Sequence, residues 1–337
     1  MAKPTPANAL VDSYGRVHDD LRISVTDRCN LRCHYCMPVD PDWFPREEIL
    51  SYEEMMRVVR IVATMGVRKV RLTGGEPLVR RDISRFVAML NATDEVQDLS
   101  LTTNGLLLDR LAEELAAAGL RRVNVSLDTL DAARFAAVTR RDALQKVIEG
   151  LRAATSAGLS PIKINAVLVR GSNDDEIESL AEYARDHGWE LRFIECMPLD
   201  NDRRWEPDRV VTGQEVRDRI SRRWPIEPKR RDDPSSPAAR WQYVDGRGSV
   251  GFIDSVSQPF CSTCSRLRLT ADGKFMVCLY DNREIDLKQL LRSGADDRAI
   301  GEAIRAAVAG KGRGGALDLL ERKEVLPASR SMHQIGG

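Results

Sequence analysis

Three cysteines near the start of the chain have a spacing that suits an iron–sulfur cluster: Cys29, Cys33 and Cys36 are separated by three residues and then by two. Three thiolates on one short loop can bind three irons of a 4Fe–4S cube, and the fourth iron then has no protein ligand. A structural zinc normally has four protein ligands. The loop therefore predicts a cluster with one coordination site left for a small molecule, and a zinc site completed by His34 is the alternative.

Three further cysteines form a second incomplete set, Cys261, Cys264 and Cys278. Arg266 and Arg268 follow Cys264 at strand spacing, so their side chains share one face beside the cysteines. Paired guanidinium groups suit a phosphate or another polyanion. The sequence therefore predicts a metal site next to an anion site. A zinc ribbon whose fourth ligand is distant, with the two arginines on a solvated strand face, is the alternative.

The stretch between residues 21 and 199 alternates between strand-like and helix-like patterns. The expected strands are 21–25, 70–73, 99–102, 123–127, 162–169 and 191–197. The expected helices are 52–65, 82–90, 110–118, 131–157 and 174–186. A rhythm of about six β/α units predicts a parallel sheet with crossover helices, curled into a partial (β/α)6 TIM-like barrel. A doubly wound flat sheet is the competing topology, and in both folds the functional groups gather at the C-terminal ends of the strands.

The pattern changes after residue 225. Residues 227–240 mix prolines, alanines, serines and charges, which predicts an exposed loop. Beyond it we expect two hairpins and two helices, at 241–255, 267–279, 287–291 and 298–309. The chain is therefore divided into an N-terminal arm (1–20), a barrel (21–225) and a C-terminal region (226–337) that carries the second cysteine set and a Gly-Gly tail.

The composition excludes several classes of protein. Hydrophobic residues make up 42% and charged residues 30% of the 337 positions, as is ordinary for a globular protein. The formal net charge of zero argues against a dedicated nucleic-acid binder, and no apolar run approaches the ~20 residues that span a bilayer. Seven cysteines, an odd number, are poor candidates for disulfides, so the cytoplasm is the expected compartment. The seventh, Cys196, is expected to be a buried core cysteine.

The first cysteine loop resembles that of the radical S-adenosylmethionine (SAM) superfamily. Tyr35 lies between its last two cysteines, and a Gly-Gly-Glu-Pro element at 74–77 follows the second expected strand. In this superfamily SAM chelates the open iron, and reduction of the cluster releases a 5′-deoxyadenosyl radical that takes a hydrogen atom from the substrate. The protein supplies binding, orientation and shielding from water.

Almost the whole chain is similar to one family within this superfamily, the GTP 3′,8-cyclases of molybdenum cofactor biosynthesis. The similar segments are 14–29, 193–199, 251–274 and 335–337. The resemblance implies a partial barrel with a 4Fe–4S cluster at each end of a shared cavity. It also implies cyclisation of GTP to 3′,8-cyclo-7,8-dihydro-GTP, the first step of molybdopterin synthesis.

The same resemblance implies roles for individual residues. The cluster that binds SAM would be held by Cys29, Cys33 and Cys36, and the cluster that binds the guanine base by Cys261, Cys264 and Cys278. The SAM contacts would be Tyr35, Gly75, Ser126 and Met197. The GTP contacts would be Arg22, Arg71, Thr102, Lys163, Arg266, Leu267 and Arg268, five of which are cationic, as the phosphates require. The glycines Gly336 and Gly337 would enter the active site.

The implied partners are GTP, an external electron donor and a cyclic pyranopterin monophosphate synthase that acts on the product. A homodimer is the expected assembly, and neither nucleic acid nor a membrane is involved. Two other functions remain as alternatives. A radical SAM enzyme that modifies a peptide usually has a richer cysteine set after its barrel, whereas only three cysteines follow residue 200 here. A non-enzymatic iron–sulfur or zinc protein would have fully ligated metal and would not cleave SAM.

Overall fold

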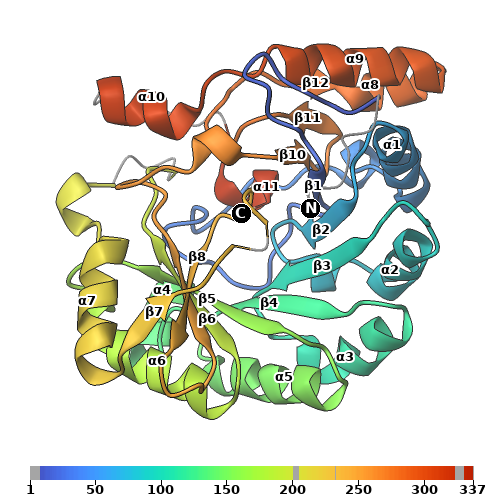
Figure 1. Ribbon diagram of the computed structural model, residues 1–337. Helices are drawn as coiled ribbons and strands as arrows, with labels where there is room; N and C mark the ends of the chain where they lie inside the picture. The colour runs from blue at the N-terminus through green and yellow to red at the C-terminus, as the bar shows by residue number, and fades with distance from the viewer. Residues whose placement is uncertain (1–7, 200–204, 232, 323–329, 337) are drawn as a thin grey trace.

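The computed structural model describes residues 8–199, 205–231, 233–322 and 330–336, and its named strands form one sheet. In the order in which they pair, the strands are β12 (Ile285–Asp286), β11 (Lys274–Met276), β10 (Arg266–Leu269), β1 (Asp20–Ser24), β2 (Lys69–Thr73), β3 (Asp98–Thr103), β4 (Arg122–Ser126), β5 (Ile162–Leu168), β6 (Glu190–Glu195), β9 (Ser249–Ile253), β8 (Ala239–Tyr243) and β7 (Ile226–Pro228). Neighbouring strands from β10 to β9 are parallel, and the outer strands at both edges are antiparallel. The sheet curves into a partial barrel (Figure 1).

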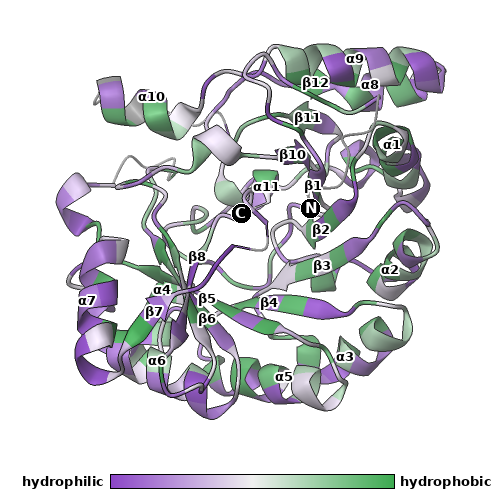
Figure 2. Cartoon of the chain, in the orientation of Figure 1, coloured by the Kyte–Doolittle hydropathy of each residue, from purple (hydrophilic) through white to green (hydrophobic). Residues whose placement is uncertain are grey.

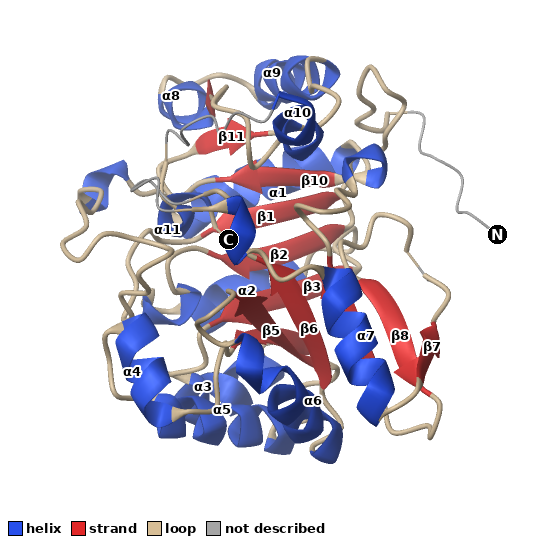
Figure 3. Cartoon of the chain, turned by 90° about the vertical axis from the view of Figure 1, so that its left-hand side faces the viewer, coloured by secondary structure: helices blue, strands red, loops and turns tan. Residues whose placement is uncertain are grey.

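The helices that connect the parallel strands lie on the outside of the curved sheet (Figures 1 and 3). They are α1 (Tyr52–Thr64), α2 (Ile83–Asn91), α3 (Leu108–Ala117), α4 (Ala132–Thr139), α5 (Leu144–Ser156), α6 (Ile177–Asp186) and α7 (Gly213–Arg223). The remaining helices are α8 (Leu287–Arg292), α9 (Asp297–Ala309), α10 (Gly315–Arg322) and α11 (Met332–Ile335). None of the helices described combines the length and the apolar character that crossing a bilayer needs.

Helix α1 illustrates why the connecting segments are helical. Ser51 and Glu54 form a reciprocal capping box, in which the Ser51 hydroxyl accepts from the Glu54 amide and the Glu54 carboxylate accepts from the Ser51 amide. Met55, Val58 and Val62 follow at helical spacing and are buried. Hydrophobic and hydrophilic residues alternate in the same way along α5 and α6 (Figure 2). Each helix therefore covers the sheet with one apolar face.

Strand β5 shows how the sheet positions polar side chains. Ile162, Ile164 and Ala166 are buried, whereas Lys163 and Asn165 between them are half-buried. Successive side chains on a strand point to opposite faces. One face of the strand therefore packs into the core, and the other turns its polar groups toward the interior of the barrel.

The six β/α units predicted between residues 21 and 199 are confirmed. Both predicted hairpins are also present, as β8–β9 and β10–β11. The sequence pattern did not indicate where they would lie: β9 pairs parallel with β6 and β10 pairs parallel with β1, so the C-terminal region extends the barrel sheet at both edges. The segment expected to be a loop, 227–240, overlaps the short strand β7, which is strand because it pairs with β8.

Candidate active site

A cavity of about 550 Å³ lies at the C-terminal ends of the parallel strands, and both cysteine triplets line it. Its walls also contain most of the other residues that the sequence assigns to the site: Tyr35, Gly75, Ser126, Met197, Arg22, Arg71, Thr102, Arg266 and Arg268. The volume is typical of a small-molecule site. The fold therefore brings residues from both ends of the chain into one chamber.

Two of the assigned GTP contacts, Leu267 and Lys163, do not line this cavity. Leu267 is fully buried in the core, because on β10 it alternates with Arg266 and Arg268 and faces the other way. A ligand could therefore meet only its backbone. Lys163 is half-buried, and its charge interacts with those of Arg192 and Arg71, which do line the cavity.

The thiols of the first triplet are held in their neutral form. Burial raises the pKa of Cys29 to about 11 and that of Cys36 to about 12. Burial, followed by the nearby Cys36, raises the pKa of Cys33 well above its ordinary value. Thiols that interact this strongly become thiolates when a metal replaces their protons. Three such groups on one loop fit a cluster that binds one thiolate per iron.

The Gly-Gly-Glu-Pro element packs directly against the first cysteine loop. The Gly75 amide donates to the Thr26 carbonyl at 2.8 Å. A Cβ atom at Gly75 would lie 2.3 Å from the carbonyl oxygen of Asp27 and 2.5 Å from that of Arg28. Only glycine permits this approach. The loop that carries the cysteines is thus seated on the end of β2.

Glu76 ties this element to the end of β3. Its carboxylate accepts from the Thr103 hydroxyl and the Asn104 amide, both at 2.7 Å, and from the Leu78 amide at 3.0 Å. Burial nevertheless raises the pKa of Glu76 to about 7. The Asn104 side chain in turn lies 3.8 Å from Cys29 Sγ. Glu76 therefore helps to position the third strand against the first triplet.

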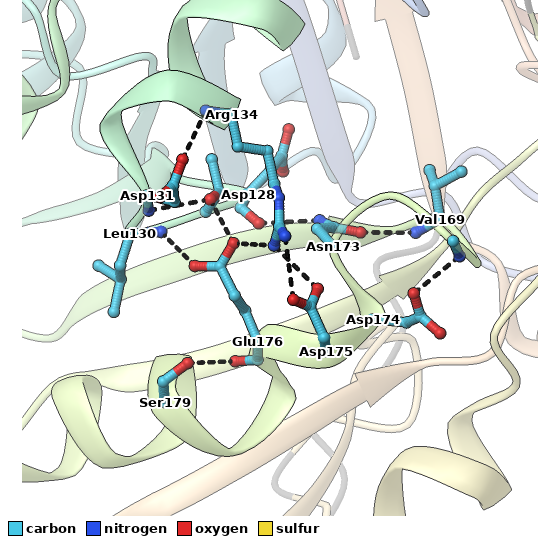
Figure 4. Close-up of polar contacts among 12 residues, drawn as sticks. Asp128, Leu130, Asp131, Arg134, Val169, Asn173, Asp174, Asp175, Glu176 and Ser179 are labelled. Carbon is cyan, nitrogen blue, oxygen red and sulfur yellow. Dashed lines mark hydrogen bonds and ion pairs between the residues drawn. The ribbon is translucent and has the colours of Figure 1, made fainter.

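A polar network behind the cysteine loop orients Tyr35. The Tyr35 hydroxyl donates to Asp128 Oδ2 at 2.6 Å, and the Val167 amide donates to Asp128 Oδ1 at 2.9 Å. Asn173 binds the backbone around this carboxylate: its amide group donates to the carbonyls of Asp128 and Val167, and its side-chain oxygen accepts from the Val169 amide (Figure 4). Asn173 thereby joins the ends of β4 and β5 beneath the site.

We expect the change Asn173→Ala to destabilise the fold by about 2–3 kcal/mol, because it removes three hydrogen bonds and leaves buried backbone groups unpaired. Chemical denaturation of the metal-free protein measures this loss. Asn91→Ala, at the exposed end of α2, is the matched control and should be close to neutral. A loss below about 0.5 kcal/mol for Asn173→Ala would contradict the structural role, because that is the range of ordinary surface substitutions.

A row of arginines crosses three adjacent strands: Arg268 is buried, and Arg22 and Arg71 are half-buried. Arg22 on β1 is directly opposite Arg268 on β10 and Arg71 on β2. Burial and the repulsion of the neighbouring arginines lower the pKa of Arg22 and Arg71 to about 9 and that of Arg268 to about 10. All three remain charged at neutral pH. The buried Arg22 Nε has no hydrogen-bond partner among the described residues, so it is available to an anion.

Sequence reasoning missed several residues of the site. Arg192 lines the cavity and forms an ion pair with Glu190 at 2.7 Å. Asp128 and Asn104 also line it. The two-residue spacing of Glu190 and Arg192 was a signal for Arg192, since every second residue of a barrel strand faces inward. Nothing in the sequence indicated that Asp128 would meet Tyr35.

The prediction for Cys196 is wrong. It is half-buried rather than part of the core, and it lines the cavity. The residue follows β6 directly, at the end where the strands supply the cavity wall. The apolar residues near Cys196 in the sequence favoured a place in the core instead.

The second triplet differs from the first in its charged neighbours. Arg266 Nε lies 3.3 Å from Cys264 Sγ. Burial opposes ionisation of Cys264, but Arg266 and Lys311 outweigh it and lower the pKa of this thiol to about 6. In the described ranges, no three side chains of Cys, His, Asp or Glu converge as the ligands of a single metal ion do.

The segment 331–336 enters the cavity region, where α11 lies near the ends of the parallel strands (Figures 1 and 3). Arg268 Nη1 donates to the Ile335 carbonyl at 3.2 Å and also to the Gly336 carbonyl. Gly336 has a φ of +70°, and a Cβ there would lie 2.5 Å from side-chain atoms of both Ser24 and Thr73. Gly337, also expected to enter the site, lies outside the described residues.

We expect Gly336→Ala to reduce turnover by about tenfold or more, because the new methyl group both clashes and disfavours the positive φ, so the segment must leave the strand ends. The measurement is the rate at which substrate is consumed. The control is Gly310→Ala, whose Cβ would meet its nearest atom at 3.5 Å, an ordinary contact. Equal rates for wild type and Gly336→Ala would show that this segment has no part in the site.

Two family models match the chain. The model described as "Radical SAM superfamily" matches residues 23–184, and the model described as "Molybdenum Cofactor Synthesis C" matches residues 189–316. The first covers the β/α units up to α6, and the second covers β6 and most of the C-terminal region with the second triplet. Together the two models include every residue that lines the cavity except Arg22 and Met332.

Relatives named GTP 3′,8-cyclase match over nearly the full length. The protein of Mycolicibacterium smegmatis is 47% identical, with coverage of 100% of this chain and 94% of the relative, and that of Streptomyces coelicolor is 46% identical, with coverage of 98% and 97%. Among solved structures, Streptococcus suis SuiB bound to precursor peptide SuiA shares the fold, with a TM-score of 0.62 at 16% identity over 86% of this chain and 68% of that one. Full-length identity of this degree shows that the chain belongs to the GTP 3′,8-cyclase family of the radical SAM superfamily.

Proposed function

We propose that this chain, a radical SAM enzyme, cyclises GTP to 3′,8-cyclo-7,8-dihydro-GTP and so performs the first step of molybdenum cofactor biosynthesis. The observation that carries the proposal is a cavity whose walls combine two incomplete thiol triplets with a row of arginines. Neither feature alone specifies GTP. Together they fit a substrate with a triphosphate and a second metal-binding group.

The triphosphate would bind to the arginine row. Arg22, Arg71 and Arg268 carry positive charge that burial makes costly and that nearby acids compensate only in part. A polyanion relieves this repulsion, and guanidinium groups bind phosphate oxygens in a bidentate manner. Lys163, Thr102, Arg266 and the backbone of Leu267 would complete the GTP contacts.

SAM would bind at the first triplet. Cys29, Cys33 and Cys36 would hold a 4Fe–4S cluster, which together with SAM would supply the radical chemistry for hydrogen abstraction from the GTP ribose. The chain's own part is to hold the reactants: Tyr35, Gly75, Ser126 and Met197 line the cavity together with the first triplet and would orient SAM. The surrounding walls would keep water away from the radical.

The second triplet would hold a second 4Fe–4S cluster. Cys261, Cys264 and Cys278 lie on the same cavity as the arginine row and supply only three ligands. With only three cysteine ligands, such a cluster would have one iron open to the guanine base. The adjacent cations fit a thiolate-rich, negatively charged group.

Further proposals concern partners and location. An external one-electron donor must reduce the first cluster, a cyclic pyranopterin monophosphate synthase would take the product, and the assembly would be a homodimer. We also propose a cytoplasmic location, because no disulfide joins any of the seven cysteines, all of which lie in the described ranges, and a reducing compartment keeps cysteines in this form. The division into arm, barrel and second-cluster region at residues 20 and 225 remains a proposal.

Anaerobic reconstitution tests the function. The full chain is expected to bind about eight irons, which is two 4Fe–4S clusters. With SAM, GTP and a strong reductant it should form 5′-deoxyadenosine while GTP is consumed. Formation of 5′-deoxyadenosine with GTP intact would overturn the assignment and favour a peptide substrate.

A matched pair of variants tests the arginine row. Arg22→Gln should raise the Kd for GTP about tenfold or more and leave the iron content unchanged, because one phosphate contact is lost. Arg110→Gln, a change of the same kind on an exposed helix position, should leave both quantities unchanged. If Arg22→Gln bound GTP with wild-type affinity, Arg22 would not be a GTP contact.

A further inference from the structure

Lys311 is buried against the second cysteine triplet. It lies in the loop between α9 and α10, and its residue is only 3% exposed. Its Nζ is 3.5 Å from Cys264 Sγ and 3.2 Å from the Arg266 carbonyl oxygen. An ammonium group in this position can balance the negative charge of a nearby thiolate.

The loop that carries Lys311 is fastened to the triplet by Arg16 from the N-terminal arm. The Arg16 guanidinium donates to the Gly312 and Arg313 carbonyls, both at 2.6 Å, and to the Cys261 carbonyl at 2.9 Å. Its own charge is balanced by Asp12 at 2.6 Å. Arg16 therefore helps to hold the loop that carries Lys311 close to the cysteines.

Glycine in the same loop permits the close approach. A Cβ at Gly314 would lie 2.3 Å from Cys261 Cβ and 2.6 Å from Cys261 Sγ, and Gly314 has a φ of +155°. Any other residue would push the loop, and Lys311 with it, away from the cysteines. The close packing of Gly314 against Cys261 thus keeps Lys311 near the triplet.

The two triplets differ in the donors that reach their sulfurs. Cys29 Sγ of the first triplet accepts from the neutral Leu31 amide at 3.4 Å, with the neutral Asn104 amide group at 3.8 Å. Cys264 Sγ of the second has two cations, Arg266 at 3.3 Å and Lys311 at 3.5 Å. Hydrogen bonds to cluster sulfurs and nearby charge set the reduction potential of an iron–sulfur cluster.

We propose that Lys311 is a positioning and charge-balancing residue for the second triplet, which makes a 4Fe–4S cluster held there easier to reduce by one electron. This inference rests on the proposed function, in which the second triplet binds such a cluster. An added electron increases the negative charge of the cluster, and a buried ammonium group in contact with a ligand sulfur stabilises that charge. Arg16 acts indirectly, since it holds the loop.

The test isolates the second cluster in the full chain. The first triplet is removed as Cys29→Ala, Cys33→Ala and Cys36→Ala, the protein is reconstituted anaerobically, and its midpoint potential is read by electron paramagnetic resonance during reductive titration with a low-potential reductant. Lys311→Met should lower the ratio of reduced to oxidised cluster at a fixed potential about tenfold, which is about 59 mV for one electron. Lys311→Arg should restore most of this shift.

Lys288→Met is the matched control. It removes a lysine whose partner is Glu48, outside the second triplet, and should leave the potential unchanged. A wild-type potential in Lys311→Met would overturn the inference. If Lys311→Met does not retain iron, Lys311→Gln takes its place in the titration. A wild-type potential in Lys311→Gln would overturn the inference. If both neutral variants lose iron and Lys311→Arg does not, the inference is supported.

The same preparation separates this inference from the proposed function. About four irons in the background variant with Lys311 intact show that the second triplet binds a cluster. Absence of iron there refutes the proposed second cluster itself. Iron at full content with an unshifted potential refutes only the role of Lys311.

Discussion

GTP affinity is expected to fall as the pH rises above about 7, with Lys163 as the main cause. Burial, followed by the nearby Arg192, lowers the pKa of Lys163 to about 7 in the ligand-free protein. Glu190 favours the charged form, but Arg122 and Arg71 oppose it. Below pH 7 the ammonium is already present when GTP arrives. Above pH 7 the complex must take up a proton, so the Kd should increase by up to about tenfold per pH unit.

Isothermal titration calorimetry across roughly pH 6 to 8, a range on both sides of the Lys163 pKa of about 7 and below the pKa of Arg22 and Arg71, measures the Kd. Buffers of different ionisation enthalpy measure the proton uptake in the same titrations. Lys163→Arg should bind GTP with little pH dependence, because a guanidinium stays charged throughout. Lys163→Met should bind more weakly at pH 6.5 and also lose the dependence. The phosphate groups of GTP titrate near pH 6, so they affect all variants alike. If Lys163→Met kept the wild-type slope, another group would have to be responsible.

Gly75→Ala is expected to reduce the rate of SAM cleavage to about one hundredth of the wild-type rate. The obstacles to a Cβ are the carbonyl oxygens of Asp27 and Arg28 at 2.3 and 2.5 Å, which are backbone atoms and cannot turn aside as a flexible side chain can. The first cysteine loop must therefore move. A displacement of about 1 Å can reduce a rate about 100-fold. The rate of 5′-deoxyadenosine formation measures the effect.

The second triplet should be unaffected, so Gly75→Ala should still bind about four irons. Gly301→Ala is the control, because its Cβ would meet the nearest atoms at 3.6 and 3.8 Å and the residue lies inside α9. That change should leave activity unchanged and stabilise the helix by about 0.5–1 kcal/mol. Normal SAM cleavage by Gly75→Ala would mean that the loop has more room than its backbone contacts imply.

The chemistry of this protein was largely predictable from residue types and local spacing. Two cysteine triplets, each one ligand short, indicated open clusters, and the separation of Arg266 from Arg268 by one residue placed both side chains on one face. The β/α rhythm predicted the parallel sheet and the side of it on which the site lies. These inferences hold because they depend on contacts within a loop, a strand or one β/α unit.

Contacts between distant segments could be known only from the tertiary structure. Strand β10 lies beside β1, which brings Arg268 opposite Arg22, and β2 on the other side of β1 brings Arg71 opposite the same residue. The meetings of Tyr35 with Asp128 and of Lys311 with Cys264 have the same origin.

The sequence by itself determined which groups could react, and the tertiary structure decided which of them meet and in what charge state. Spacing in a sequence specifies the face of a strand but not its neighbour in the sheet, and a lysine such as Lys163 or Lys311 has an ordinary pKa until burial and nearby cations lower it. Burial depends on how the whole chain packs. The sequence alone therefore showed that each cysteine triplet is one ligand short, whereas only the tertiary structure showed which cations surround it.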